Sequence, residues 1–430
     1  MTRLVVRSGR ALRGCIRVPG DKSISHRALL LGALADGPSH YSGFPASGDC
    51  QATLECLRAL GVHVEESGEG SLAVHGQGLR GLQAPTGPLN CQRSGTTMRL
   101  LAGIMAGQRF AVTLTGSSQL LRRPMRRITD PLQQMGAEIE SSAGHGPLTI
   151  RGRPLQGRVH HLSIASAQVK SALLLAGLYA DGPTIVRQPG PARDHTERML
   201  ATMGAAIRTS GLTVTIKPSP VLRPVSLRIP GDVSSAAFAL VAAILAPRSE
   251  LTIQGVGVNP TRTGLLEILA EMGAKVHLEQ CRVVADEPVA DLTVRTADLR
   301  AISVRGDRVV RMIDELPVLA VAATQARGTT VVRDAAELRV KETDRIATVV
   351  LELRALGAQI EPLEDGFVVT GPTSLRGAHV DSHGDHRLAM ALSVAGLIAQ
   401  GEVVVKNVQC IDDSFPGFVK WMREIGADYG

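Results

Sequence analysis

The positively charged residues of this chain gather where short polar motifs come before runs of alanine and leucine. Lys22, Ser23 and Arg27 follow a Pro-Gly-Asp turn at 19–21, and several later runs have a comparable polar start. A helix N-terminus already carries partial positive charge, so lysine and arginine are unfavourable there unless an anion binds among them. These motifs therefore predict sites for small anionic molecules.

Five such starts share this pattern. They are Lys22, Ser23 and Arg27; Arg93, Ser94, Gly95 and Thr96; Ser166, Gln168 and Lys170; Asp314 and Glu315; and Asp385, His386 and Arg387. Ser23 and Asp385 alone would suit simple helix caps, whereas the cations beside them indicate a function. The charged segments 121–127, 193–198 and 338–346 are compatible with either an anion site or a solvated surface. If 338–346 is helical, Lys341 and Arg345 lie on one face.

Several other kinds of chemistry are not indicated. The chain has no G-x-x-x-x-G-K-[ST] loop, no dinucleotide-binding G-x-G-x-x-G after a strand and no nucleophile elbow. Its histidines and cysteines show no metal-ligand spacing, and its six cysteines form no Cys-x-x-Cys pair. We therefore expect general acid–base chemistry on phosphate- and carboxylate-bearing metabolites, with neither metal nor cofactor.

The composition limits the class of protein. With 430 residues, 44% of them hydrophobic and 20% charged, the chain is typical of a globular protein of two or three domains. The longest apolar run, 236–246, is shorter than the roughly 20 residues of a bilayer span, and the N-terminus lacks a signal-peptide core. We expect a cytoplasmic protein without a membrane partner. The net charge of +7 would suit nucleic acid, but only 2% of the residues are aromatic, so few could stack on bases.

Two interleaved repeats, each with a period of roughly 70 residues, predict the elements that position these motifs. In the first, an amphipathic helix ends at a left-handed glycine and a strand follows; the glycines are Gly61, Gly136, Gly204, Gly273, Gly357 and Gly426. In the second, a cap-type residue precedes a helix that is apolar all round; the caps are Ser23, Ser94, Ser166, Ser234, Asp314 and Asp385. The predicted fold class is α/β, with buried helices.

The Pro-Gly-Asp motif itself occurs twice, at 19–21 and 230–232. Both copies continue with a serine two residues later, but Lys22, His26 and Arg27 of the first copy correspond to Val233, Ala237 and Phe238 of the second. The shared residues predict a structural turn, and the cations predict a function added to one copy. This duplication favours two similar domains over a plain solenoid.

Five motifs together resemble the 5-enolpyruvylshikimate-3-phosphate synthase family. They are PGDKSISHR at 19–27, SGTTMR at 94–99, RPM at 123–125, LRVKETDR at 338–345 and DHR at 385–387. The resemblance implies a two-domain inverted (inside-out) α/β barrel of six βαβαββ repeats, three in each domain. It places the first domain at 20–229, the second at 1–19 plus 230–430, and hinges near 19–22 and 228–232.

The resemblance also implies an activity: transfer of the enolpyruvyl group of phosphoenolpyruvate to the 5-hydroxyl of shikimate 3-phosphate, with release of phosphate. The implied shikimate 3-phosphate ligands are Lys22, Ser23, Arg27, Ser166, Ala167, Gln168, Arg193, Asp314 and Lys341. The implied phosphoenolpyruvate ligands are Lys22, Gly95, Arg123, Gln168, Arg345 and Arg387. Asp314 is the implied base, and Glu342 together with Lys22 the implied proton donor. A monomer is expected.

Two alternatives stay open. A UDP-N-acetylglucosamine enolpyruvyl transferase would share the fold and the donor, but Lys22 is followed by serine rather than asparagine, and 116–127 contains no cysteine. An RNA-binding or RNA-end-processing protein would suit the basic charge, but the scarcity of aromatic residues and the presence of Asp314, Glu342 and Arg387 argue against it.

Overall fold

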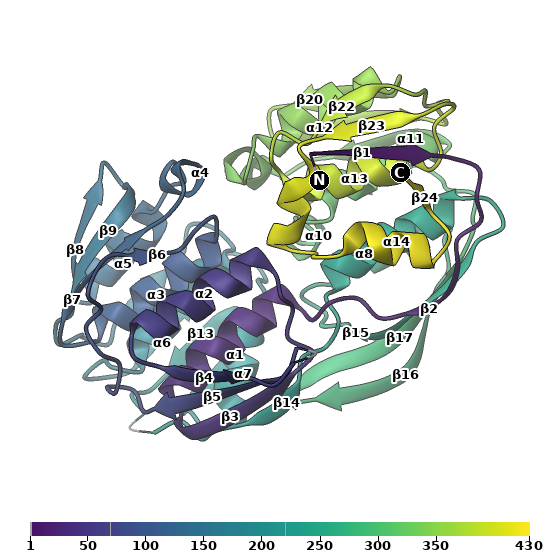
Figure 1. Cartoon of the computed structure of the whole chain (residues 1–430). Helices are drawn as coiled ribbons and strands as arrows, with labels where there is room; N and C mark the ends of the chain where they lie inside the picture. The colour runs from purple at the N-terminus through teal and green to yellow at the C-terminus, as the bar shows by residue number, and fades with distance from the viewer. Residues whose placement is uncertain (1, 69, 220) are drawn as a thin grey trace. The chain divides into compact units, whose positions relative to one another are not determined.

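Six four-stranded sheets with one shared topology form the framework of the computed structural model, which describes residues 2–68, 70–219 and 221–430. Each sheet has a parallel pair of strands at one edge. In the sheet β10–β11–β13–β12, the other two pairings are antiparallel. Helices alternate with groups of strands along the chain, so the predicted α/β class is confirmed (Figure 1).

The chain forms two compact units, each with its own hydrophobic core. Unit 1 comprises Met1–Pro19, Pro230–Val283 and Pro288–Gly430; unit 2 comprises Gly20–Ile229 and Val284–Glu287. The sequence-based division kept 230–430 together, whereas the short turn Val284–Glu287 groups with unit 2. In this turn, Oε1 of Glu287 lies 2.7 Å from Nδ1 of the buried His195, which belongs to unit 2.

Three sheets belong to unit 2. They are β14–β3–β5–β4 (Ser226–Arg228, Asp36–Ser42, Leu72–Gln77, His63–Glu66), β6–β7–β9–β8 (Leu89–Asn90, Ala111–Thr115, His145–Arg151, Glu138–Ser142) and β10–β11–β13–β12 (Val159–His161, Thr184–Arg187, Thr213–Ile216, Ile207–Ser210). Its helices are α1 (Lys22–Leu34), α2 (Gly48–Ala59), α3 (Gly95–Ala106), α4 (Ser118–Leu121), α5 (Arg126–Gln134), α6 (Ala167–Gly177) and α7 (His195–Thr202).

The other three sheets belong to unit 1. They are β22–β23–β1–β24 (His379–Asp381, Val403–Lys406, Arg3–Arg7, Asp428–Tyr429), β16–β17–β15–β2 (Val276–Val284, Glu287–Arg295, Glu250–Gly257, Arg13–Ile16) and β18–β19–β21–β20 (Ser303–Val304, Gly328–Val332, Gly366–Gly371, Gln359–Leu363). Its helices are α8 (Val233–Leu245), α9 (Gly264–Glu271), α10 (Asp307–Arg311), α11 (Leu316–Gln325), α12 (Arg345–Ala355), α13 (His386–Gly396) and α14 (Phe418–Glu424), with short 3-10 turns at Ala336–Val340 and Val408–Asp413.

The chain ends meet in unit 1. Strand β1, at the start of the chain, lies between β23 and β24 and pairs antiparallel with both. The N- and C-termini are therefore close together (Figure 1). Strand β2 likewise pairs with β15, which comes much later in the sequence.

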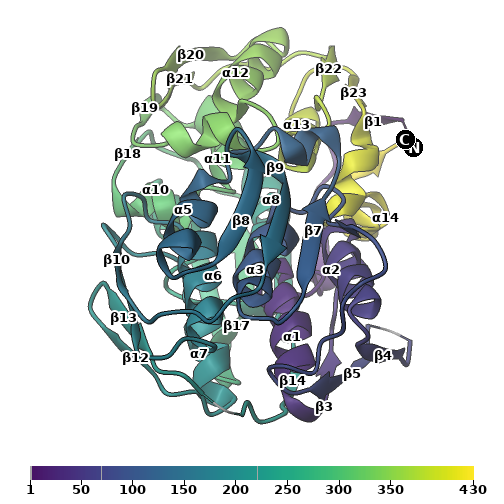
Figure 2. The same ribbon diagram turned by 90° about the vertical axis from the view of Figure 1, so that its left-hand side faces the viewer.

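Helices with alanine- and leucine-rich sequences fill the interior of each unit. Nearly every residue of α1, α3 and α6 in unit 2, and of α8, α11 and α13 in unit 1, is buried. A helix that is apolar all round has no solvent face, so it must be covered on every side. In unit 2, Figure 2 shows the sheet β6–β7–β9–β8 lying in front of α3 and α6. No helix in the described chain combines the length and hydrophobicity needed to cross a lipid bilayer.

The first repeat is confirmed in full. All six glycines of that series have positive φ, a conformation that side chains rarely adopt. Each glycine follows a helix and precedes a strand, as α2, Gly61 and β4 illustrate. The helix–glycine–strand pattern was therefore a reliable guide to the fold.

The second repeat needs a correction at its caps. Ser94, Ser166 and Asp385 are N-caps as predicted. In the two Pro-Gly-Asp copies, however, the caps are Asp21 and Asp232, whose carboxylates accept the backbone N–H of Ile24 at 2.9 Å and of Ser234 at 2.8 Å. The aspartate that ends each Pro-Gly-Asp turn accepts a free N–H group at the start of the helix. Ser23 and Ser234 therefore lie within the first helical turn. Asp314 likewise precedes the true cap position, Glu315.

The contact between α3 and α6 yields a stability prediction. A Cβ added at Gly103 would lie 2.2 Å from the carbonyl oxygen of Ala172. Gly103→Ala should lower the free energy of unfolding by about 1–3 kcal/mol through overpacking, even though alanine is favoured over glycine in a helix. Urea unfolding measures the change. Gly182→Ala is the matched control, because no atom lies within 4 Å of its added Cβ. Equal stability of the two variants would contradict the prediction.

Candidate functional site

The polar motifs of unit 2 lie at the N-terminal ends of its three buried helices. Lys22 and Ser23 begin α1, Gly95 begins α3, and Ala167 and Gln168 begin α6. Helix N-termini present free backbone N–H groups and partial positive charge. In unit 2, cationic side chains therefore join groups that already attract anions.

Arg27 is held by side chains from several elements. Its Nε donates to Thr196 Oγ1 at 2.6 Å, its Nη1 to the Ser23 carbonyl at 2.8 Å and its Nη2 to Ser171 Oγ at 2.8 Å. Arg193 Nη1 approaches Ser23 Oγ at 3.5 Å. The structure thus brings together the predicted ligands Ser23, Arg27 and Arg193. Arg27 is almost fully buried, so its orientation is fixed before any substrate binds.

The charge of Arg27 survives this burial. Burial lowers the pKa of Arg27 to about 10, and the carboxylates of Glu197 and Asp21 oppose that effect. The group therefore remains protonated at neutral pH. Its charge is little hydrated, which strengthens its attraction for an anion.

A second group in unit 2 surrounds Gly95. Gln168 Nε2 donates to Thr96 Oγ1 at 2.9 Å, while Arg99 Nη1 donates to Gln168 Oε1 at 2.6 Å. A Cβ at Gly95 would lie 2.9 Å from Nη1 of both Arg99 and Arg123. The glycine therefore lets two guanidinium groups approach the start of α3. Gly95, Arg123 and Gln168 are brought together as predicted.

Lys22 has a partner that the sequence did not suggest. Its Nζ lies 2.7 Å from Asp49 Oδ2, and both side chains are largely buried. Asp49 lies in the first turn of α2, which packs against α1. The ion pair holds the lysine at the start of α1.

A buried chain of hydrogen bonds links α1 to the start of α3. His26 Nδ1 lies 2.7 Å from Thr53 Oγ1, Thr53 Oγ1 lies 2.7 Å from Thr97 Oγ1, and Thr97 donates to Ser94 Oγ at 2.7 Å. Burial lowers the pKa of His26 to about 3, despite the nearby carboxylate of Asp49. His26 is therefore neutral in the folded protein.

This neutral histidine predicts a specific acid sensitivity. The unfolded chain binds a proton at His26 near the ordinary pKa of 6.5, whereas the folded chain does so only near 3. Stability present above pH 6.5 is therefore lost as the pH falls towards 3, and at pH 5 the loss from this group is about 2 kcal/mol. His26→Asn should reduce the difference in unfolding free energy between pH 7.5 and pH 5 by that amount. An unchanged difference in urea titrations would contradict the assignment.

Arg345 is the centre of the charged cluster in unit 1. Its Nε donates to Asp385 Oδ2 at 2.7 Å, its Nη2 to Glu342 Oε2 at 2.6 Å and its Nη1 to Asp314 Oδ1 at 3.4 Å. Lys341 Nζ lies 3.5 Å from the same Asp314 oxygen. The structure therefore brings together Asp314, Lys341, Glu342 and Arg345.

The route to this cluster differs from the prediction for 338–346. The segment is not one helix: a 3-10 turn ends at Val340, and α12 begins at Arg345 after the capping residue Asp344. Lys341 and Arg345 thus do not share a helix face, which excludes the helical alternative for this segment. They meet at Asp314 because the irregular segment turns between them.

Carboxylates surround Arg345 and favour its charged form. Burial alone lowers the pKa of Arg345, but Asp385 and Glu342 outweigh it and raise that pKa above its ordinary value. Asp385 also caps α13 by accepting the Arg387 backbone N–H at 2.9 Å. The Arg387 guanidinium lies 6.0 Å from the centre of the Phe238 ring. Asp385 thus fixes Arg345 and the start of α13 together.

Sequence reasoning missed the residues that orient the predicted ligands. Arg99 had a usable signal, because it lies four residues after Gly95 and therefore on the same helix face. Thr196 lay within the segment 193–198 noted above, whereas Asp49 and Ser171 had no signal, because they reach Lys22 and Arg27 only through tertiary packing.

Comparison with known proteins gives the family. Residues 6–422 match the family described as EPSP synthase (3-phosphoshikimate 1-carboxyvinyltransferase). The chain is 52% identical to the enzyme of that name from Geobacter sulfurreducens, over 99% of this chain and 100% of the relative. It is 49% identical to that from Brevibacillus brevis, over 96% and 98%. An EPSP synthase structure from Acinetobacter baumannii matches with a TM-score of 0.89 and 40% identity, covering 100% of this chain and 99% of the other.

These similarities extend over all the motifs described above. The family match spans both units and includes each helix start that carries a cationic motif. The chain belongs to the EPSP synthase family.

Proposed function

We propose that this protein is a 3-phosphoshikimate 1-carboxyvinyltransferase. It transfers the enolpyruvyl group of phosphoenolpyruvate to the 5-hydroxyl of shikimate 3-phosphate and releases phosphate. The observation that carries the proposal is the presence of cationic clusters at buried helix N-termini in a chain about half identical, over nearly its full length, to enzymes of that name. The same relatives favour this activity over the two alternatives.

The binding assignments follow the chemistry of each cluster. Ser23, Arg27 and Arg193, which lie together, suit the phosphate and carboxylate of shikimate 3-phosphate. The start of α6 adds Ser166, Ala167 and Gln168 to this substrate, as helix N–H groups do for anions. Asp314 and Lys341 are assigned to the ring hydroxyls.

Phosphoenolpyruvate carries a phosphate and a carboxylate, so it needs several cations. In unit 2 we assign it Lys22, Arg123, Gln168 and the backbone at Gly95. The absence of a side chain at Gly95 leaves an anion free to approach both the helix start and Arg123. In unit 1 we assign Arg345 and Arg387, whose positions are fixed through Asp385.

The proposed reaction is an addition followed by an elimination. The 5-hydroxyl loses its proton and bonds to C2 of phosphoenolpyruvate, while C3 gains a proton. The C2–O bond to phosphate then breaks, C3 loses a proton, and the enol double bond is restored. Negative charge develops on the departing phosphate, which the fixed guanidinium groups stabilise without reorganising.

Asp314 and Glu342 are the assigned acid–base groups. Asp314 acts as the base on the hydroxyl, and the cations of Lys341 and Arg345 lie next to it. Glu342, together with Lys22, delivers the proton to C3. Oε2 of Glu342 accepts from Arg345 Nη2 at 2.6 Å, which orients this carboxylate.

A comparison of acceptor substrates tests the activity. Phosphate release from phosphoenolpyruvate should require shikimate 3-phosphate and should not occur with UDP-N-acetylglucosamine. Turnover with the nucleotide sugar alone would identify the sister transferase instead. RNA binding in a filter assay, without phosphate release in the presence of either acceptor, would support an RNA-binding or RNA-end-processing protein.

The acid–base assignment predicts loss of kcat with little change in substrate binding. Asp314→Asn and Glu342→Gln should each lower kcat by about 100-fold or more, because a positioned acid or base contributes about 10²–10⁴ to the rate. Glu361→Gln is a control for the loss of one carboxylate, since Glu361 is exposed on β20 and pairs with Arg354. Wild-type kcat in either site variant would reject its role.

Three further expectations concern the domain boundaries, the oligomeric state and the cellular location. We infer domains at 20–229 and at 1–19 plus 230–430, with hinges near 19–22 and 228–232; the two compact units support this division except at Val284–Glu287. A monomer is expected from the family resemblance, and analytical ultracentrifugation tests it. Action in the cytoplasm agrees with six cysteines that are free thiols.

A further inference from the structure

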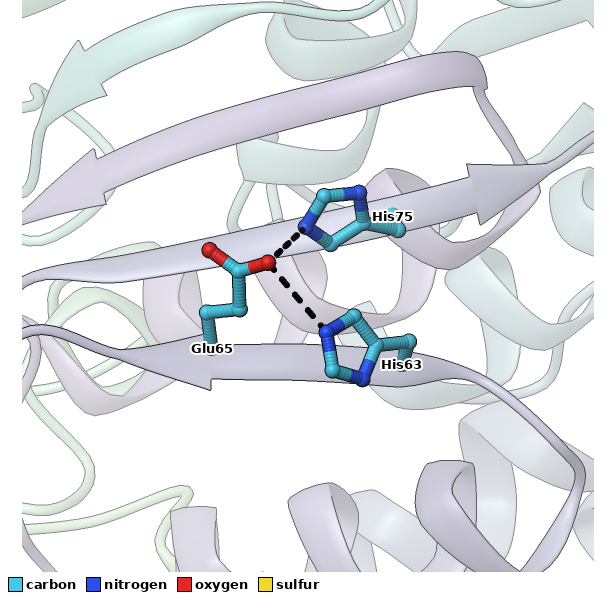
Figure 3. Close-up of side chains that lie close together, drawn as sticks. All are labelled: His63, Glu65 and His75. Carbon is cyan, nitrogen blue, oxygen red and sulfur yellow. Dashed lines mark hydrogen bonds and ion pairs between the residues drawn. The ribbon is translucent and has the colours of Figure 1, made fainter.

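Two histidines and a glutamate meet on the solvent-facing side of the sheet β14–β3–β5–β4. His63 and Glu65 are two residues apart on β4, so they point to the same face, while Val64 between them points into the core. His75 on β5 lies directly opposite His63, and Glu65 lies opposite the small Ala73. Figure 3 shows the Glu65 carboxylate directed between the two imidazole rings.

Their ligand atoms are close enough to share one ion. Oε1 of Glu65 lies 3.2 Å from Nε2 of His63 and 3.0 Å from Nε2 of His75. All three atoms lie within 4.8 Å of one another. A tetrahedral zinc ion with bonds of about 2.0–2.2 Å holds its ligands about 3.4 Å apart. Two of the three spacings are therefore already close to those of a zinc site.

His75 and Glu65 meet at ion-pair distance, without the directed geometry of a good hydrogen bond. Within the described chain, Nε2 of His75 is buried from solvent and has no partner in hydrogen-bonding geometry, although Glu65 lies 3.0 Å away. The nitrogen and the carboxylate oxygen are therefore close in distance but poorly aligned for a hydrogen bond. A metal ion placed between them would use the nitrogen lone pair and the carboxylate oxygen at once.

We propose that His63, Glu65 and His75 bind a zinc ion, with a fourth position open to water. Two imidazoles and one carboxylate suit zinc and similar transition metals, whereas magnesium and calcium prefer oxygen ligands alone. The ion joins the edge strand β4 to β5. The site lies outside every residue assigned to substrate binding or catalysis, so it stabilises this sheet rather than taking part in the reaction.

Neighbouring residues provide matched controls. Glu66 follows Glu65 on β4, but its carboxylate is bonded to Arg58 at 2.6 Å. His40 on β3 is exposed and pairs in register with Ala73, which places it on the same face beyond the cluster. Glu66→Gln and His40→Ala therefore remove a similar group without removing a proposed ligand.

Zinc titration of the metal-stripped, untagged full chain tests the site. Calorimetry should show one zinc ion per chain and no comparable binding of magnesium. His63→Ala, His75→Ala and Glu65→Gln should each weaken zinc binding by about tenfold or more, since even residues supporting a ligand are worth about 10–100-fold. Glu66→Gln and His40→Ala should bind zinc as the wild type does.

A second measurement guards against unfolded variants and surface binding. Zinc should raise the Tm of the wild type and of both controls, but not that of His75→Ala, because only a bound ion stabilises the fold. His75→Ala should retain wild-type kcat, which shows that the variant is folded. Absence of zinc binding by the wild type would overturn the proposal. Equal binding by His75→Ala would also do so, since the zinc would then occupy other groups, such as the exposed thiols of Cys15 and Cys281.

Discussion

Burying a helix on every side leaves its N-terminus as the place where polar groups must be satisfied. The six interior helices of this protein are apolar along their length, so their first turns collect the serines, aspartates and arginines of the core. The free N–H groups there attract oxygen atoms. The same constraint that makes the core stable therefore also gathers polar and cationic groups at the places where we propose that anions bind.

The two Pro-Gly-Asp copies show how one turn serves two purposes. In unit 2 the turn leads to Ser23, which lies beside the guanidinium groups of Arg27 and Arg193. In unit 1 Ser234 instead donates to the carboxylate of Glu315 and accepts from Arg262 at 2.7 Å. The second copy thus contains its own anion and cation, both buried. The turn is structural in each case, and only the first copy carries Lys22 and Arg27, the cations that we assign to substrate binding.

Much of this could be predicted from the sequence because it depends on local patterns. The glycine series succeeded, since a left-handed residue after a helix nearly requires glycine. The sequence left 338–346 open between a solvated helix face and an anion site, because only the tertiary turn of this segment brings Lys341 to Asp314. The cluster of His63, Glu65 and His75 could not be predicted from the sequence for another reason. Strand register sets its geometry, and residues 63 and 75 become neighbours only when β4 pairs with β5.

The pairing of β1 with β23 and β24 has a consequence for the order of assembly during synthesis. All strands of the three unit 2 sheets lie between residues 36 and 228, so they are available once that stretch has left the ribosome. Strand β1 precedes every other strand of the described chain, whereas its partners β23 and β24 follow all the others. The nascent chain must therefore keep β1 unpaired until β23 and β24 have also been made.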